Sequence, residues 1–247
     1  MDLSDELMKS LDIETVFTIT IAGHSIPVTE TVVVSWVVML LLIIAAFIFT
    51  RNMRQVPRGA QAIVEACVDF LNNFSKNQFG KYSGIFGPYI GTLFLFLLLS
   101  NIIPAITPVF AAGKEPLFEI KPPTRDVNLC AALALVSILL TFFSGLVVRG
   151  PLGWFKNLFH PVPVMLPFNL MEYVIKPLSL CLRLFGNILG AFIIMSLINI
   201  ALANAISFSM VIPIPFSLYL DFFDGFVQAL VFTFLTALYI SEAVEID

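Results

Sequence analysis

Several ionisable side chains lie inside long apolar stretches near the C-terminal end of the sequence: Glu172, Arg183, Asp221 and Asp224. A charged group at the depth of a lipid bilayer costs several kcal/mol by insertion scales, so such residues are typical of ion and proton pathways. An arginine keeps its charge at any accessible pH, whereas a carboxylate can take up a proton or a sodium ion. These residue types therefore predict an ion path that is interrupted by a permanent positive charge.

The first apolar stretch carries its polar groups on one helical face. At about 100° per residue, Ser179 and Arg183 return to within about 20° of the direction of Glu172. Lys176 and Asn187 lie within about 60° of that direction. The spacing thus predicts a polar stripe along an otherwise apolar helix.

A second apolar stretch also gathers its polar groups. Asp221, Asp224 and Gln228 are spaced i, i+3 and i+7, which places them on one face of a helix. On the first stretch, Gly186 and Gly190 lie on the side of the polar stripe, and small residues let another helix approach closely. The stripe is therefore expected to face a closely packed partner.

The two stretches run in opposite directions, so the depths of their polar groups can be compared. At 1.5 Å per residue, Glu172 lies roughly 16 Å from Arg183, and Asp221 lies about 10 Å from Gln228. If Gln228 lies at the depth of Arg183, the carboxylates flank the arginine on opposite sides of the membrane. Such a path consists of two separate relays, and a moving partner must carry each ion past the central charge.

The composition indicates that these helices belong to a membrane protein. Of the 247 residues, 59% are hydrophobic and 12% are charged, and the mean hydropathy of +0.97 is far above that of a soluble domain. Segments of this length and polarity can cross a bilayer as helices. We expect membrane segments at roughly 32–49, 86–108, 128–148, 162–202 and 212–241.

The predicted fold is an all-α polytopic membrane protein with about five membrane-embedded segments. Apolar residues at helical spacing in 59–74 predict an additional amphipathic surface helix. We expect a single domain over 1–247, with an external segment 1–30, peripheral spans 31–150 and an ion-conducting hairpin 151–247. Both limbs of the hairpin exceed a perpendicular span, so they either tilt strongly or break.

The distribution of basic residues predicts the orientation. Arg51, Arg54 and Arg58 directly follow the first span, which favours a cytoplasmic location for that end. The N-terminus is then outside, and the C-terminus is cytoplasmic. The acidic N-terminal stretch lacks the basic region of a signal peptide. We expect a multi-pass protein of a bacterial-type inner (plasma) membrane.

Other function classes find little support in the sequence. It contains no Gly-rich phosphate loop, HExxH or GxSxG motif, and its net charge of −4 does not favour nucleic acid. The cysteines are odd in number, far apart and outside any CxxC pair, as expected of small packing residues: Cys67, Cys130 and Cys181. We therefore expect no cofactor, no bound metal and no nucleic-acid partner.

Two motifs carry a resemblance to a known family. The segments KPLSLCLRLFGNILGA (176–191) and FVQALVFTFLTALYI (226–240) closely resemble subunit a of the F-type ATP synthase membrane sector. PTRDVNLCAALAL (123–135) and LLLSNIIP (97–104) are similar to its other signature segments, and the resemblance extends over nearly the whole chain from about residue 30. It implies a rotating c-subunit ring as the moving partner, a b-subunit peripheral stalk, and ATP chemistry on other subunits.

The resemblance also implies roles for individual residues. Arg183 matches the essential stator arginine, and Asn187 and Gln228 match positions beside it. Glu172 matches an acidic position of the inner half-channel. Asp221 matches an outer half-channel position that holds Glu or His in many relatives.

Some of the expected half-channel residues depart from the family pattern or have other readings. Phe192 stands where many bacterial relatives have a glutamate, and we expect Asp221 and Asp224 to take over its role. Asp224 has no familiar counterpart. Ser179 and Asn101 complete the predicted half-channels.

Several alternatives remain open from the sequence. Asn101 can equally bond between helices, Lys176 can extend its ammonium to the membrane surface, and Asp126 can cap the third span. The alternative function is a self-contained, ion-coupled secondary transporter, a class that usually shows inverted repeats. The coupling ion can be H⁺ or Na⁺.

Overall fold

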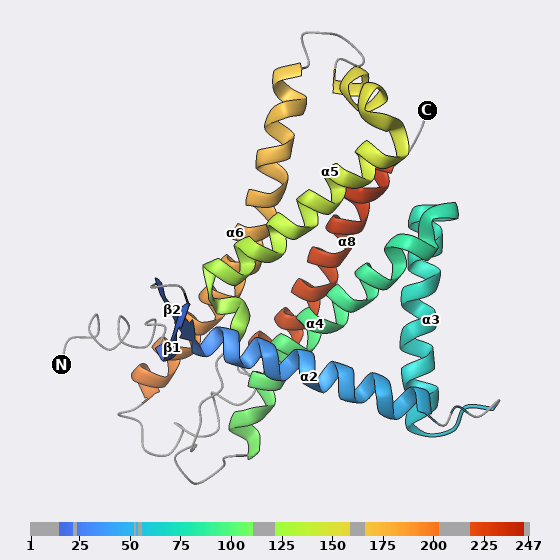
Figure 1. The fold of residues 1–247 in the computed structure, drawn as a ribbon. Helices are drawn as coiled ribbons and strands as arrows, with labels where there is room; N and C mark the ends of the chain where they lie inside the picture. The colour runs from blue at the N-terminus through green and yellow to red at the C-terminus, as the bar shows by residue number, and fades with distance from the viewer. Residues whose placement is uncertain are drawn as a thin grey trace. The chain divides into compact units, whose positions relative to one another are not determined.

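The computed structural model describes residues 15–21, 24–51, 53, 56–110, 122–158, 166–202 and 218–244 (Figure 1). Its elements follow one another along the chain as β1 (Thr15–Ile21), β2 (His24–Thr29), α2 (Glu30–Arg51), α3 (Ala60–Phe79), η1 (Gly80–Tyr82), α4 (Ser83–Phe110), η2 (Pro123–Arg125), α5 (Val127–Leu158), α6 (Leu166–Leu202), η4 (Leu218–Asp224) and α8 (Gly225–Val244).

The chain forms two compact units, and each is assembled from separate stretches of sequence. The first contains Met1–Leu41, Phe96–Leu129 and Leu184–Gln228. The second contains Leu42–Leu95, Cys130–Arg183 and Ala229–Asp247. Several long helices contribute residues to both units.

The apolar helices confirm the predicted fold class. Within the described ranges, five helices are long and apolar enough to cross a membrane: Glu30–Arg51, Ala60–Ile103, Val127–Trp154, Leu166–Met195 and Phe222–Val244. Each overlaps one of the apolar segments expected from the sequence. The chain is an all-α polytopic membrane protein, and its described residues add one short hairpin of strands.

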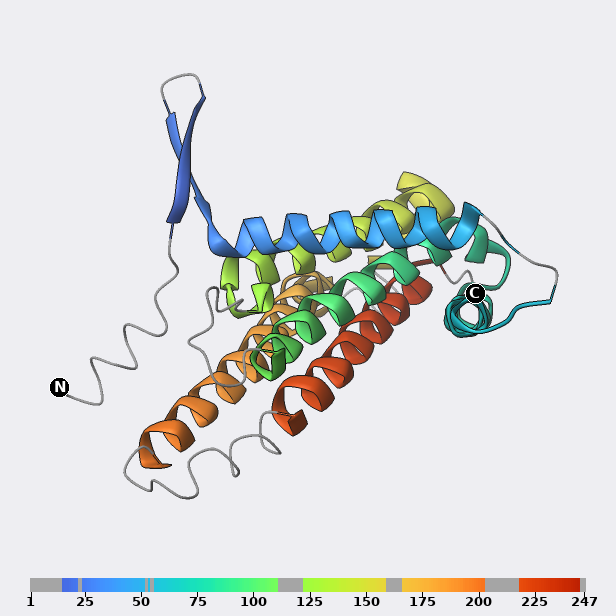
Figure 2. The same ribbon diagram turned by 90° about the horizontal axis from the view of Figure 1, so that it is seen from below.

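That hairpin belongs to the first unit and was not predicted from the sequence. β1 and β2 pair antiparallel, with Ile19 opposite Ile26 and Thr20 opposite Ser25. β1 reads TVFTITI, and such β-branched and aromatic residues favour strands. Figure 2 shows the hairpin projecting from the beginning of α2, to which β2 is joined directly.

In the second unit, α3 is the amphipathic helix that the sequence predicted. It buries Leu71, Ser75 and Phe79 at intervals of four residues, while Ile63 and Phe70 are exposed. This two-sided pattern is that of a helix with one packed face. Its location at a membrane surface stays a prediction.

The core of the second unit joins the end of α3 to α4 and α8. It is a cluster of six buried side chains: Phe79, Phe86, Ile90, Ala237, Ile240 and Val244. The Ser241 hydroxyl on α8 also donates a hydrogen bond of 2.8 Å to the Gln78 carbonyl on α3. The C-terminal end of α8 is therefore fixed by packing and by polar contacts.

The helix α5 starts at a cap and contains a kink. Asp126 accepts a hydrogen bond of 2.8 Å from the Asn128 backbone N–H, which confirms the predicted cap. Gly150 has φ 73° and ψ 162°, a conformation that favours glycine, and Pro151 follows it. The chain therefore changes direction between the main part of α5 and its last residues.

The two limbs of the predicted hairpin differ in regularity. The first limb, α6, is one helix of 37 residues, or about 55 Å, which far exceeds the roughly 30 Å hydrocarbon thickness. The second limb begins as a π-helix over Leu218–Asp224 before it becomes the α-helix α8. The turn between the limbs, including Pro213 and Pro215, lies outside the described residues.

Candidate ion-translocation site

The helix α6 exposes the central residues of the predicted polar stripe. Arg183 and Asn187 are exposed and Ser179 is half-buried, whereas Leu180 and Leu184 are almost completely buried. In the part of the chain that the structure describes, the Arg183 and Asn187 side chains make no hydrogen bond or ion pair. Among the described residues no side chain pairs with this guanidinium, which lies on an exposed face of α6.

The surface around Arg183 is apolar and partly flat. Leu178 and Leu182, on an adjoining side of α6, are exposed by 53% and 55%, and Gly186 adds no side chain one turn after the arginine. An isolated guanidinium on an apolar helix is costly in lipid, so such a group normally pairs with an acceptor on a neighbouring helix. The face therefore suits a partner that brings its own carboxylate.

The second predicted face is formed where η4 passes into α8. Gln228 is 5% exposed, and its side chain forms a hydrogen bond with Asp224, one turn earlier. The wider π turn over Leu218–Asp224 is closed by bonds between residues five apart, so the α-helical angle expected between Asp221 and Gln228 does not apply. The side chains of Asp221 and Phe192 lie outside the described part of the structure.

Asn101 forms a buried polar node in the first unit. Its amide N–H donates to the Gly225 carbonyl at 3.2 Å, and its amide oxygen accepts from the Thr124 hydroxyl at 2.6 Å. Asn101 and Thr124 are 4% and 0% exposed. The reading of Asn101 as a bond between helices is thus confirmed, while its place in an ion path stays a prediction.

Gly225 is required at this node because of a close approach. A Cβ at position 225 would lie 2.7 Å from the Cβ of Asn101, a distance that real side chains do not reach. The glycine follows Asp224 directly and precedes Gln228 by three residues. The node therefore fixes the backbone between two of the predicted half-channel residues.

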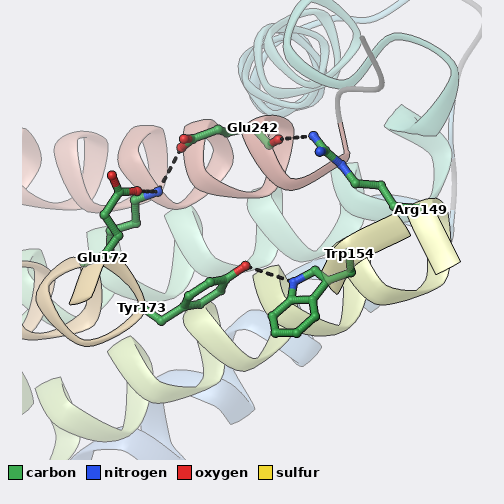
Figure 3. Close-up of polar contacts among 6 residues, drawn as sticks. Arg149, Trp154, Glu172, Tyr173 and Glu242 are labelled. Atoms are coloured by element: carbon green, nitrogen blue, oxygen red, sulfur yellow. Dashed lines mark hydrogen bonds and ion pairs between the residues drawn. The ribbon is translucent and has the colours of Figure 1, made fainter. Parts of the chain in front are cut away.

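A charged cluster in the second unit contains Glu172. The Lys176 ammonium lies 2.9 Å from the Glu172 carboxylate and 3.0 Å from the Glu242 carboxylate (Figure 3). It also lies 5.2 Å from the centre of the Tyr239 ring. Lys176 is therefore a shared partner of two carboxylates, and its place at the membrane surface stays a prediction.

Glu242 is the member of this cluster that the sequence analysis missed. It was assigned to the C-terminal tail, although its position three residues after Tyr239 places it on the same helical face. The helix α8 continues to Val244, so Glu242 belongs to its last turn. This helical spacing is the only signal in the sequence that could have included it.

Arg149 holds the end of α8. Its Nε donates to the Ala243 carbonyl at 3.0 Å, and its Nη2 donates to the Glu242 carbonyl at 3.1 Å. These carbonyls belong to the last turn of the helix, where they have no partner within the helix itself. Figure 3 shows Glu242 with its backbone toward Arg149 and its carboxylate on the opposite side.

After the kink at Gly150, α5 makes a second contact near Glu172. The Trp154 indole N–H donates to the Tyr173 hydroxyl at 3.0 Å, and both rings pack near Phe142. Because Tyr173 follows Glu172 directly, the first turns of α6 are held on two sides (Figure 3). The predicted relay residue thus stands on a well-supported turn.

The comparison with known families shows to which family this chain belongs. The model of the family described as ATP synthase A chain matches residues 32–241. The chain belongs to this family, subunit a of the F-type ATP synthase. The match includes both motif segments, Arg183 and Gln228, and it confirms the resemblance drawn from the sequence. Glu242 lies just beyond its last residue.

Membership in this family accounts for the membrane helices and for a place in the Fo sector of an ATP synthase. Among the residues that the structure describes, no group of three or more His, Cys, Asp or Glu side chains could hold a metal ion.

Proposed function

We propose that this subunit is the stator of ion-driven rotation, with two offset half-channels for H⁺ or Na⁺ and Arg183 between them. A ring of c subunits passes the exposed face of α6 and carries one neutral carboxylate past the arginine at a time. The b-subunit peripheral stalk holds the stator against this rotation. The observation that carries the proposal is the Arg183 guanidinium on an exposed face of α6, where no described side chain pairs with it.

The half-channels are assigned to the two polar groups of the site. Glu172 and Ser179 belong to the cytoplasmic half-channel, which opens near the charged end of α8. Asp221, Asp224, Gln228 and Asn101 belong to the outer half-channel, and Asn187 lines the path beside Arg183. The basic residues after α2 support this orientation, with the N-terminus outside and the C-terminus cytoplasmic in a bacterial-type inner membrane.

The test is replacement of the arginine in the assembled synthase. Arg183→Ala should insert normally but reduce ion-driven ATP synthesis in membrane vesicles to background, and it should allow a passive ion leak. Arg183→Lys should also fail largely, because an ammonium lacks the planar fork and can lose its proton when it is buried. ATP synthesis near the wild-type rate in either variant would refute the proposal.

A matched control is available on the described surface. Arg51 is an exposed arginine at the end of α2, and within the described residues its side chain makes no hydrogen bond or ion pair. Arg51→Gln removes one positive charge from the same subunit and should leave ATP synthesis unchanged. A loss of equal size in both variants would indicate a general effect of charge.

A further inference from the structure

The end of α8 is set by a bidentate contact from α5. Arg149 donates from two different nitrogens to two successive carbonyls, those of Glu242 and Ala243. A guanidinium presents its donors in a rigid planar fork, so both contacts together fix where the last helical turn lies. Gly145, one turn earlier on α5, lies beside the same turn: a Cβ there would lie 3.4 Å from the Ala243 carbonyl oxygen, an ordinary contact distance.

The position of this turn decides where the Glu242 carboxylate lies. Arg149 holds the carbonyl of Glu242, and the side chain of the same residue reaches the Lys176 ammonium at 3.0 Å. The Tyr239 ring, three residues earlier, faces the same ammonium. The last turn of α8 thus forms one side of the environment of Lys176.

The Lys176 ammonium forms ion pairs with both carboxylates at once. An ammonium has three N–H donors, so it can serve Glu172 and Glu242 at the same time. The carboxylate side chains are 52% and 58% exposed, whereas that of Lys176 is 22% exposed. Without Glu242, Glu172 would be left in a one-to-one ion pair with its neighbour on α6. With Glu242 in place, the three side chains carry one uncompensated negative charge, and the chain itself leaves more than half of each carboxylate side chain uncovered.

We infer that Arg149 and Glu242 are positioning residues for Glu172: Arg149 fixes the last turn of α8, and Glu242 there draws Lys176 away from an exclusive pair with Glu172. The Glu172 carboxylate thereby stays available to exchange ions with the aqueous side. The inference rests on the proposed place of Glu172 in the ion path. The inference adds Arg149 on α5 and Glu242 on α8 as residues on which the role of Glu172 in the ion path depends.

The experiment measures whether Arg149 acts through Glu172. ATP-driven ion pumping is recorded in membrane vesicles that carry the whole synthase, normalised to the amount of assembled subunit. Glu172→Gln, Arg149→Gln, the double variant and the Arg51→Gln control are compared. Each single variant of the pair should lower the pumping rate about three- to tenfold, and the double variant should be no slower than Glu172→Gln alone.

The four rates separate the possible outcomes. If the losses multiply in the double variant, or if Arg149→Gln pumps at the wild-type rate, Arg149 does not act through Glu172 and the inference is wrong. If Glu172→Gln itself has no effect, the proposed half-channel role of Glu172 fails, independently of Arg149. A merely structural role for Arg149 would reduce pumping with and without the Glu172 carboxylate.

A second variant keeps the test decisive if Arg149→Gln does not assemble. Glu242→Gln leaves both backbone contacts with Arg149 in place and removes only the charge that competes for Lys176. It should reduce pumping in the wild-type background and have no further effect on Glu172→Gln. Glu242→Asp, which keeps the charge, should restore part of the rate, and failure of both expectations would overturn the inference.

Discussion

The two ends of α8 are held by different chemistry. At Gly225 the contact is a neutral amide, Asn101, which is almost completely buried together with its partner Thr124. At Glu242 the contacts are charged, and the carboxylates of the cluster are more than half exposed. Each end lies in a different compact unit of the chain.

The difference follows from the cost of removing polar groups from water. A buried neutral amide is tolerated when its hydrogen bonds are satisfied, whereas a buried ion pair must overcome a desolvation penalty of several kcal/mol per ion. Fully buried contacts are therefore made by Asn101, and ionic contacts are made where water reaches the side chains. We expect the buried node to control stability and the ionic cluster to contribute less to it.

The largest effect is expected from filling the space at Gly225. Gly225→Ala places a Cβ 2.7 Å from the Cβ of Asn101, and such overpacking costs roughly 1–3 kcal/mol. The thermal unfolding midpoint of the purified subunit in detergent should fall clearly. Gly84→Ala is the control, because a Cβ at the exposed Gly84 meets nothing within 4 Å. Equal midpoints for the two variants would contradict the close approach.

Removing the amide should have the next largest effect. Asn101→Ala removes the acceptor of the hydrogen bond from the buried Thr124 hydroxyl, at a cost of about 1–3 kcal/mol in unfolding free energy. Adding Thr124→Val removes the hydroxyl that lost this acceptor and should recover part of the loss. Thermal unfolding of the single and double variants checks this, and a double variant less stable than Asn101→Ala would argue against the bond.

A smaller effect is expected from the Trp154 indole. Trp154→Phe keeps an aromatic ring beside Phe142 but loses the donor to Tyr173, which should cost about 1 kcal/mol. Tyr173→Phe should cost about the same, and the double variant should be no worse than either single one. Additive losses in the unfolding midpoints would show that the two side chains act separately.

The smallest change should come from the ionic cluster and should depend on salt. Lys176→Met should lower the unfolding free energy by no more than about 1 kcal/mol, as is usual for partly exposed ion pairs. At about 1 M salt this loss should shrink, because the screening length falls to roughly 3 Å. The loss in Asn101→Ala should not change with salt. If the loss of unfolding free energy in Lys176→Met did not depend on salt, the proposed difference between the two ends of α8 would be wrong.

The sequence predicted the elements of this protein better than it predicted their contacts. Long apolar runs identify spanning helices because backbone groups in lipid must be satisfied within the segment. Arg183 and Gln228 stood out because polar groups are rare in such runs. Local helical spacing also found the pair of Glu172 and Lys176, which is four residues apart.

The missed features depend on information that is not local. Arg149 was not among the predicted site residues, because its partners on α8 are 93 and 94 residues away in sequence. Glu242 is 66 residues from Lys176. The π turn was not predicted either, since an apolar run fits i+4 and i+5 bonding equally well. Only the packing of Asn101 against Gly225 marks where that turn must end.

The π turn before Gly225 can absorb the insertion or deletion of a residue, so that such a change does not shift the register of α8. A π turn accommodates an additional residue within an otherwise α-helical run. If one residue were deleted from Leu218–Asp224, we expect this turn to become α-helical, while the chain on either side of it keeps nearly the same facing. Gly225, Gln228 and the rest of α8 would keep their register, which cysteine cross-linking from position 101 to α8 can verify. Insertions and deletions can thus retune the carboxylates of η4 without disturbing the helix that follows.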